Sequence, residues 1–266
     1  MKRFILYTLI GYTLFGCEEV VQLDLDTAPS RLVIDAQIKI SENEESIQRI
    51  VLSLTNGFYE QTPIMVDDAL VEIKEVDNDV VYTFSHDDNE VGNYTSDFTP
   101  DPNTNYKLVI NYDGEVYESS TEQLVPAVPI DNLTQGTETL FTGDEIEVLV
   151  TITDVDNRDD FYIFDFGFNN FLATKDEFYQ GNEFTFSYFL DDLEAGDTAV
   201  ISIYGADEAY FNFMTAVIEQ TEEGGDPFKT TPSTVRGNIY NVTNTNHYPM
   251  GYFSIGEAYT SSILLE

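Results

Sequence analysis

The chain has 266 residues, and its 49 acidic and 11 basic side chains give a formal net charge of -38 at pH 7. Such a charge repels the phosphate backbone of DNA and RNA, so nucleic acid is excluded as a partner. Hydrophobic residues make up 42% of the chain and aromatic residues 14%, which excludes a disordered acidic polymer and provides enough apolar surface for a folded core.

Residues 1–16 have the layout of a secretory signal peptide. Lys2 and Arg3 precede an apolar run at 4–15, and no acidic residue occurs before position 17. A membrane-spanning helix needs about 20 apolar residues, so this run is too short to cross a bilayer. We therefore expect residues 1–16 to be a lipoprotein signal peptide that is removed.

Cys17 follows the apolar run and is the only cysteine of the chain, so no disulfide can form within it. Leu14-Phe15-Gly16-Cys17 resembles a bacterial lipobox, in which a small residue precedes the cysteine that receives lipid on its sulfur. We expect Cys17 to hold the protein on outer-membrane lipid, since acyl chains contribute about 0.8 kcal/mol per buried methylene. The alternative is a small buried cysteine in a first strand.

Two glutamates at positions 18 and 19 begin an acidic tether, residues 17–29. Acidic residues at this place resemble the export signal of Bacteroidota lipoproteins that reach the outer face of the outer membrane. The resemblance implies an outer-membrane protein exposed at the cell surface, with the periplasmic face as the alternative. Asp-Thr-Ala at 26–28 also resembles a Bacteroidota O-glycosylation sequon, which makes Thr27 a candidate glycosylation site.

Alternating apolar and polar residues predict short strands in the first half of the mature chain. The alternation occurs at 34–40, 50–54, 69–73, 80–84 and 106–112. Asp113-Gly114 suits a type I′ turn, so the chain should return through 115–119 as a hairpin. These features predict an antiparallel Ig-like or transthyretin-like β-sandwich at 30–126. Prolines within 125–133 disfavour a central strand and mark a linker.

Residues 127–266 are predicted to form a second β-rich domain that carries one helix. Strand patterns occur at 146–152, 162–168, 184–188 and 199–203. Tyr210, Phe213, Met214 and Val217 recur at helical spacing, and Asp207 suits the N-terminal end of a helix dipole. We expect a helix near 207–220 that covers one face or edge of the second sheet. The predicted fold class is therefore mainly β.

The sequence offers no arrangement typical of a catalytic site. Its two histidines, His86 and His247, lie in polar, loop-like contexts, and no nucleophile elbow, zinc motif or phosphate-binding loop is present. We therefore predict that the protein is not an enzyme and has no cofactor, apart from calcium at one turn.

That turn contains Asp154, Asp156 and Asp159 between two predicted strands. Carboxylate oxygens are the hard ligands that calcium prefers, so these three residues are candidate calcium ligands. The loop does not have the glycine and glutamate positions of an EF-hand. The alternative is an acidic turn that faces solvent.

Five segments in register resemble a Bacteroidota outer-membrane lipoprotein family of unknown function. They are residues 17–38, the joint VPAVPIDNL at 125–133, DVDNRDDFYIF at 154–164, and two C-terminal segments at 226–244 and 249–256. The resemblance implies a front β-sandwich and genes that often lie beside those of TonB-dependent receptors. It favours a non-catalytic binding or accessory module of a TonB-dependent nutrient uptake system. The alternative is a structural or adhesive surface lipoprotein.

Overall fold

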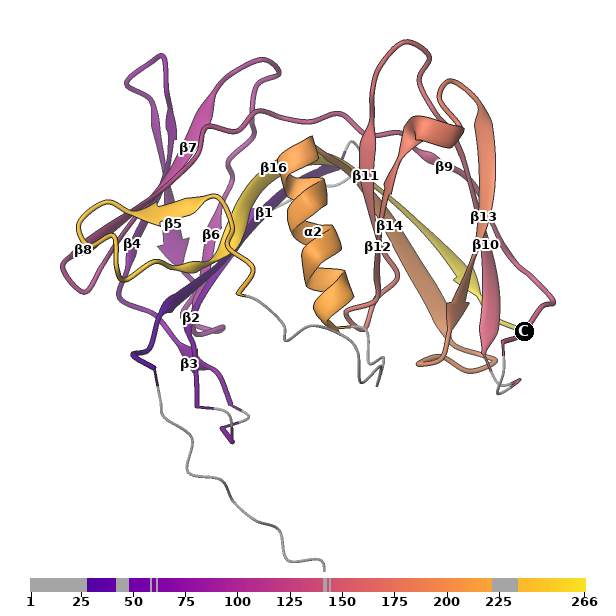
Figure 1. The fold of residues 1–266 in the computed structure, drawn as a ribbon, viewed down its shortest axis with the longest axis horizontal. Coiled ribbons are helices and arrows are strands. Elements are labelled where there is room, and N and C mark those ends of the chain that lie inside the picture. Colours follow the sequence, from indigo (N-terminus) through magenta and orange to yellow (C-terminus); the bar gives the residue numbers. More distant parts are fainter. Residues whose placement is uncertain are drawn as a thin grey trace, which may run out of the picture.

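A computed structural model describes residues 28–41, 48–57, 59–60, 62–140, 143, 145–221 and 234–266. Over these ranges the fold is mainly β with one α-helix, as predicted (Figure 1). The signal peptide and nearly all of the tether lie outside the described residues. No helix within the described ranges has the length and apolar content needed to span a membrane.

The first sandwich packs two layers of strands around one core. One layer contains β1 (Leu32–Ser41), β2 (Gln48–Leu54), β3 (Ile64–Met65), β6 (Asn93–Ser96) and the first half of β16 (Met250–Leu264). The other contains β4 (Leu70–Glu75), β5 (Val81–His86), β7 (Tyr106–Tyr112), β8 (Glu115–Ser119) and β15 (Ile239–Asn241). Fully buried Ile34, Ile50 and Phe253 face Ile73 and Leu108 across the core. The alternation read in the sequence therefore marks the inward face of each strand.

The β7–β8 hairpin confirms the turn predicted from Asp113-Gly114. Both residues have positive φ, 48° and 75°, as a type I′ turn requires. Tyr112 pairs with Glu115 directly across the turn. A short sequence signal thus fixes the register of two strands.

The second sandwich packs a three-stranded sheet onto the end of the large sheet. The small sheet contains β9 (Ile130–Gln135), β10 (Ile146–Thr153) and β13 (Glu183–Leu190), and it faces β11 (Phe161–Asp165), β12 (Phe171–Lys175), β14 (Thr198–Ala206) and the second half of β16. Val150 and Ile152 meet Phe164 and Ile201 in a core whose side chains are fully buried. β11 ends before Phe168, which has φ 53° and is exposed, so the strand is shorter than the predicted 162–168.

β16 belongs to both sandwiches. It pairs in parallel with β1 from Met250 to Ala258 and antiparallel with β14 from Ala258 to Leu264, so one sheet passes from the first sandwich into the second (Figure 1). Residues 239–258, predicted as part of the second domain, therefore lie in the first sandwich. The parallel pair also departs from the predicted antiparallel arrangement, because periodicity shows which face of a strand is buried and not which strand lies beside it.

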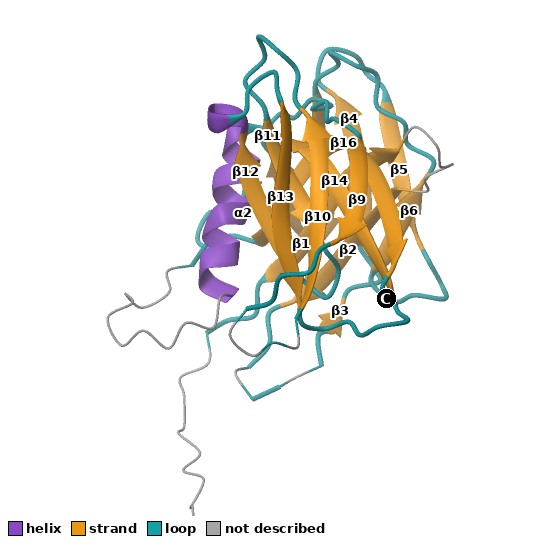
Figure 2. Cartoon of the chain, turned by 90° about the vertical axis from the view of Figure 1, so that its right-hand side faces the viewer, coloured by secondary structure: helices purple, strands orange, loops and turns teal. Residues whose placement is uncertain are grey.

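Helix α2 (Glu208–Thr221) packs on the face of the large sheet that points away from both cores. Its first turn is capped by Asp207, whose Oδ1 accepts a hydrogen bond of 2.7 Å from the backbone N of Tyr210. Tyr210 and Met214 are buried against Tyr204 of β14 and Tyr252 of β16. Figure 2 shows the helix against one side of the stacked strands. The helix lies within one residue of the predicted range and covers a sheet face as expected.

Two glycines allow β16 to start directly beside β1. Gly251 has φ 101°, and a Cβ atom there would lie 1.9 Å from the carbonyl oxygen of Ile34. A Cβ atom at Gly237 would lie 1.7 Å from the carbonyl oxygen of Gly251. No larger residue fits at either position unless the backbone moves.

We predict that Gly251→Ala lowers the free energy of unfolding by about 2–5 kcal/mol, since it adds a backbone clash to the strain of a positive φ. Gly196→Ala is the matched control, because Gly196 has φ 98° and a Cβ atom there would have nothing within 4 Å. The free energy of unfolding of the control should fall by only about 1–2 kcal/mol, which is the strain energy of a side chain at positive φ. Urea unfolding measures both variants, and equal losses would contradict the clash.

His247 joins the start of β1 to the loop before β16. Its Nδ1 lies 2.7 Å from Oε2 of Glu115, and its Nε2 lies 2.7 Å from the carbonyl oxygen of Ser30. A carbonyl and a carboxylate only accept hydrogen bonds, so the protonated ring, which donates from both nitrogens, satisfies both contacts. The Ser30 carbonyl, and then Glu115, raise the pKa of His247. The same contact, helped by Tyr117, lowers the pKa of Glu115 to about 2.

The sign of this linkage predicts a loss of stability at higher pH. The folded-state pKa of His247 is raised, so its contribution is complete below the unfolded-state value of about 6.5 and is lost as the pH rises through the folded-state value. Urea unfolding from about pH 6 to about pH 9 should show this decline, and His247→Gln should flatten it. His86→Gln, which changes the other histidine, should leave the decline in place. A decline that persists in His247→Gln would refute the assignment.

Candidate functional site

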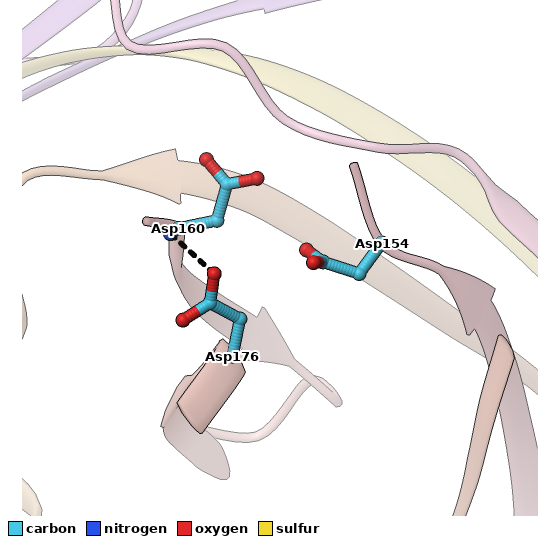
Figure 3. A group of neighbouring side chains, drawn as sticks. All are labelled: Asp154, Asp160 and Asp176. Carbon is cyan, nitrogen blue, oxygen red and sulfur yellow. Dashed lines mark hydrogen bonds between the residues drawn. The ribbon is translucent and has the colours of Figure 1, made fainter. Parts of the chain in front are cut away.

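The structure gathers three acidic side chains, and only one of them is a predicted calcium ligand. Asp154, Asp160 and Asp176 are buried, with one ligand atom from each within 4.8 Å of the others (Figure 3). Asp156 and Asp159 come from the same turn but are exposed and lie outside this group. Cys17 and Thr27 lie outside the described residues, so lipidation and glycosylation stay predictions.

Three strand ends position the acidic group. Asp154 follows β10, Asp160 precedes β11, and Asp176 follows β12 as the first residue of the short 3-10 helix η1 (Asp176–Phe178). The backbone N of Asp176 donates to the carbonyl oxygen of Asp160 at 3.1 Å, which continues the pairing of β11 and β12. Asp160 stands beside the predicted residues in the sequence, whereas Asp176 is 16 residues further on and no sequence pattern links it to the turn.

A tyrosine lies between two of the carboxylates. The hydroxyl of Tyr162 is 2.8 Å from Oδ1 of Asp154 and 2.9 Å from Oδ2 of Asp160. Burial, and then the hydrogen bonds to Asp154 and Asp160, raise the pKa of Tyr162 far above its usual value. The hydroxyl therefore stays protonated, and its single proton is shared between the two acids.

The remaining donors come from one arginine and two backbone amides. Nε of Arg158 donates to Oδ1 of Asp160 at 2.5 Å, and the backbone N of Gly181 donates to Oδ2 of Asp154 at 2.8 Å. The backbone N of Asp160 donates to Oδ2 of Asp176, also at 2.8 Å. Together with Tyr162, these groups place four donors near five carboxylate oxygens, both of Asp154, both of Asp160 and one of Asp176, with the Tyr162 proton shared between two of them.

Charge in the group is only partly compensated. Three carboxylates share one guanidinium, and one guanidinium nitrogen, Nη2 of Arg158, is buried without a hydrogen-bond partner among the described residues. Burial, with a further contribution from neighbouring Asp154 and Asp160, raises the pKa of Asp176. The group is therefore a hydrogen-bonded network in which the surroundings of Asp176 disfavour the ionised form of its carboxyl group.

Calcium fits this donor set poorly. The ion takes six to eight oxygen ligands, and here the carboxylate oxygens already accept hydrogen bonds from protein donors, one of them positively charged. The arrangement is that of a polar network that ties three strand ends together. Calcium binding by Asp154, Asp156 and Asp159 stays a prediction, with Asp154 alone placed in the group.

We predict that Tyr162→Phe lowers the free energy of unfolding by about 1–3 kcal/mol, because two buried carboxylates lose their shared donor. Tyr240→Phe is the control, since Tyr240 is 60% exposed on β15. Thermal melts with and without millimolar calcium test the ion on the same samples. A rise in melting temperature that Asp154→Asn abolishes would establish calcium, while the absence of both a melting shift and a calorimetric heat would remove it.

The fold and the acidic group define a mainly β protein in which two sandwiches share one sheet. The chain matches the family model described as a domain of unknown function (DUF4249) over residues 18–262. It therefore belongs to this family, and the predicted membership of a family of unknown function holds. The match covers both sandwiches and helix α2.

Solved structures show only a distant likeness. A DUF4785 family protein from Legionella pneumophila subsp. pneumophila str. Philadelphia 1 has 12% identity and a TM-score of 0.23, with 65% of this chain and 52% of that chain covered. The chicken interferon gamma receptor alpha chain has 14% identity and a TM-score of 0.22, with 68% and 90% covered. The chain thus spans about half the length of the Legionella protein. No curated protein matches the sequence.

Proposed function

We propose that the protein is a lipid-anchored outer-membrane lipoprotein that acts as a non-catalytic binding or accessory module of a TonB-dependent nutrient uptake system. The observation that carries this proposal is the position of Cys17, directly after a basic start, a short apolar run and a small residue. The resemblance of five segments to Bacteroidota lipoproteins supports the membrane and the receptor. Glu18 and Glu19 support export to the cell surface.

The length of the tether limits where the folded part can lie. Leu32, the first residue of β1, is 15 residues after Cys17. An extended chain spans at most about 3.3–3.6 Å per residue, so β1 starts within about 50 Å of the anchor. An accessory protein held at this distance meets an integral receptor without leaving the membrane surface.

The architecture supports binding better than catalysis. Both sandwiches share β16, so surfaces on the two halves are held in fixed relative positions, which suits a docking module. The acidic group of Asp154, Asp160 and Asp176 is buried, and all but one of its carboxylate oxygens lie within hydrogen-bond distance of a protein donor. It therefore presents neither a free base nor a nucleophile to a substrate.

An affinity pull-down tests the proposal with tagged protein from gently solubilised outer membranes. We expect a TonB-dependent receptor in stoichiometric amount and an intact mass that shows lipid on Cys17. Cys17→Ala should leave the membrane fraction and lose the receptor, whereas Thr27→Ala, a neighbouring tether variant, should keep both.

Other outcomes of the pull-down separate the parts of the proposal. Recovery of the lipoprotein alone would favour the structural or adhesive alternative. An unlipidated Cys17 in the membrane fraction would overturn the anchor. Protease shaving of intact cells then decides the membrane face, because digestion is expected only for a surface-exposed protein.

A further inference from the structure

Two arginines of the described chain differ from the other basic residues in their ion pairing. The described residues include eight lysines and arginines, and six of them lie within 4.0 Å of a carboxylate. The six pairs are Lys39–Asp165, Arg49–Glu90, Lys74–Glu72, Lys107–Glu118, Arg158–Asp160 and Lys175–Glu177. Arg31 and Arg236 pair with no carboxylate in the described part of the chain. Since the sequence has 49 acidic residues, a shortage of partners does not explain this.

The two unpaired arginines contact the same aromatic ring. The guanidinium carbon of Arg31 lies 3.6 Å from the centroid of the Tyr248 ring, and that of Arg236 lies 3.8 Å from it. Nη1 of Arg31 also donates to the carbonyl oxygens of Tyr248 at 3.0 Å and Asn246 at 3.3 Å. These contacts use the ring face and neutral carbonyls, so within the described part of the chain no carboxylate neutralises either positive charge.

A third cation lies beside them. His247 precedes Tyr248, and both of its ring nitrogens face acceptors, an arrangement that suits the protonated, positive ring. Among the described residues, the carboxylate that contacts it is Glu115. With His247 protonated, three cations and one anion among the described residues give a local charge of +2 (3 − 1) in a chain of net charge -38. We call Arg31, Arg236, His247 and Tyr248 the arginine patch.

The chemistry of the arginine patch suits a phosphate group. Two like charges held on one ring repel each other, and an anion beside them offsets that repulsion. A guanidinium presents a planar fork of N–H donors that matches two oxygens of a phosphate. Arg236 is exposed and Arg31 is half-buried, so donors of both remain available to a ligand.

We propose that the arginine patch binds the phosphate groups of anionic membrane lipid headgroups and so orients the anchored protein on the membrane. This inference rests on the proposed anchor, because Arg31 is only 14 residues after Cys17 and lies within about 50 Å of it. A tether of this length keeps the patch at a high effective concentration at the membrane surface. Contacts too weak to bring the free protein from solution to the membrane are then sufficient to select one orientation of the anchored protein.

The rest of the molecule favours the same orientation. An anionic membrane repels an acidic surface, so the patch is the part that approaches most easily. At physiological ionic strength the Debye length is about 8 Å, which screens acids further away while direct contacts persist. Repulsion of the acidic surface and attraction of the arginine patch therefore favour the same orientation on the membrane.

The unique cysteine allows a direct test. The chain from Cys17 onward is coupled through its thiol to a maleimide lipid in vesicles. The vesicles consist of phosphatidylcholine, with or without about one third phosphatidylglycerol. Mass spectrometry then measures the rate at which phenylglyoxal modifies each arginine. We expect Arg31 and Arg236 to react about fivefold more slowly on the anionic vesicles, which corresponds to about 1 kcal/mol per cation. Arg49, exposed and paired with Glu90, should react equally on both and serves as the internal control.

A pair of double variants separates the patch from net charge. Hydrogen exchange of the exposed loop at 242–248 should slow on anionic vesicles for the wild type and for Lys74→Gln/Lys107→Gln. Arg31→Gln/Arg236→Gln, which changes the net charge equally, should lose this protection. Equal protection in both double variants would overturn the role of the patch.

Three further results would overturn the lipid as the ligand. Equal arginine rates on the two vesicles would show no contact with anionic headgroups. Protection by millimolar inorganic phosphate without vesicles would assign the patch to a free phosphate ion, and protection by soluble polyglutamate would assign it to an acidic protein. Chemical coupling replaces cellular lipidation, so failure here is distinct from failure of the proposed anchor.

Discussion

The pairing of β16 with both β1 and β14 is the contact on which the rest of the structure depends. Successive residues of this strand alternate between the two cores and the helix: Phe253 and Ile255 face the first core, whereas Tyr252 and Ala258 face α2. The strand comes from the end of the chain, while β1 is the first strand described. The large sheet is therefore complete only when the two ends of the fold have met, a long-range contact that slows folding.

Side chains also cross the shared strand. Lys39 of β1 lies 3.9 Å from the ring centroid of Tyr204 on β14 and 3.8 Å from Oδ2 of Asp165 on β11, and the Tyr204 hydroxyl donates to the same carboxylate. Register places Gly256 beside Lys39 and Ala258 beside Tyr204, so small residues of β16 leave room for the long side chain. Burial lowers the pKa of Lys39 and raises that of Tyr204. The sandwiches are thus joined by a polar bridge as well as by backbone hydrogen bonds.

Local features of the fold were predictable because their signals are local. Alternation located most strands, Asp113-Gly114 located a hairpin, and the spacing of Tyr210 and Met214 located the helix. Partners distant in the chain were not predictable: nothing near Met250 indicates that its strand returns to β1, and nothing near Asp176 indicates that it meets Asp154. The arginine patch was missed for the same reason, since Arg31 is 205 residues (236 − 31) before Arg236, and each member looks like an ordinary surface residue.

One register accounts for both the shared sheet and the arginine patch. Val33 pairs with Met250 in the parallel ladder, so Arg31 and Tyr248, two residues earlier on each strand, lie side by side where the ladder begins. Asn238 donates to the carbonyl oxygen of Phe253 and accepts from its backbone N, which holds the segment containing Arg236 against the start of β16. The pairing that unites the sandwiches therefore also gathers the unpaired positive charges at the point where the chain enters the fold from its tether. The proposed anchor at Cys17 and the proposed phosphate-binding patch at Arg31 are only 14 residues apart in the sequence, so the proposed membrane orientation would be a property of the fold rather than of a separate element.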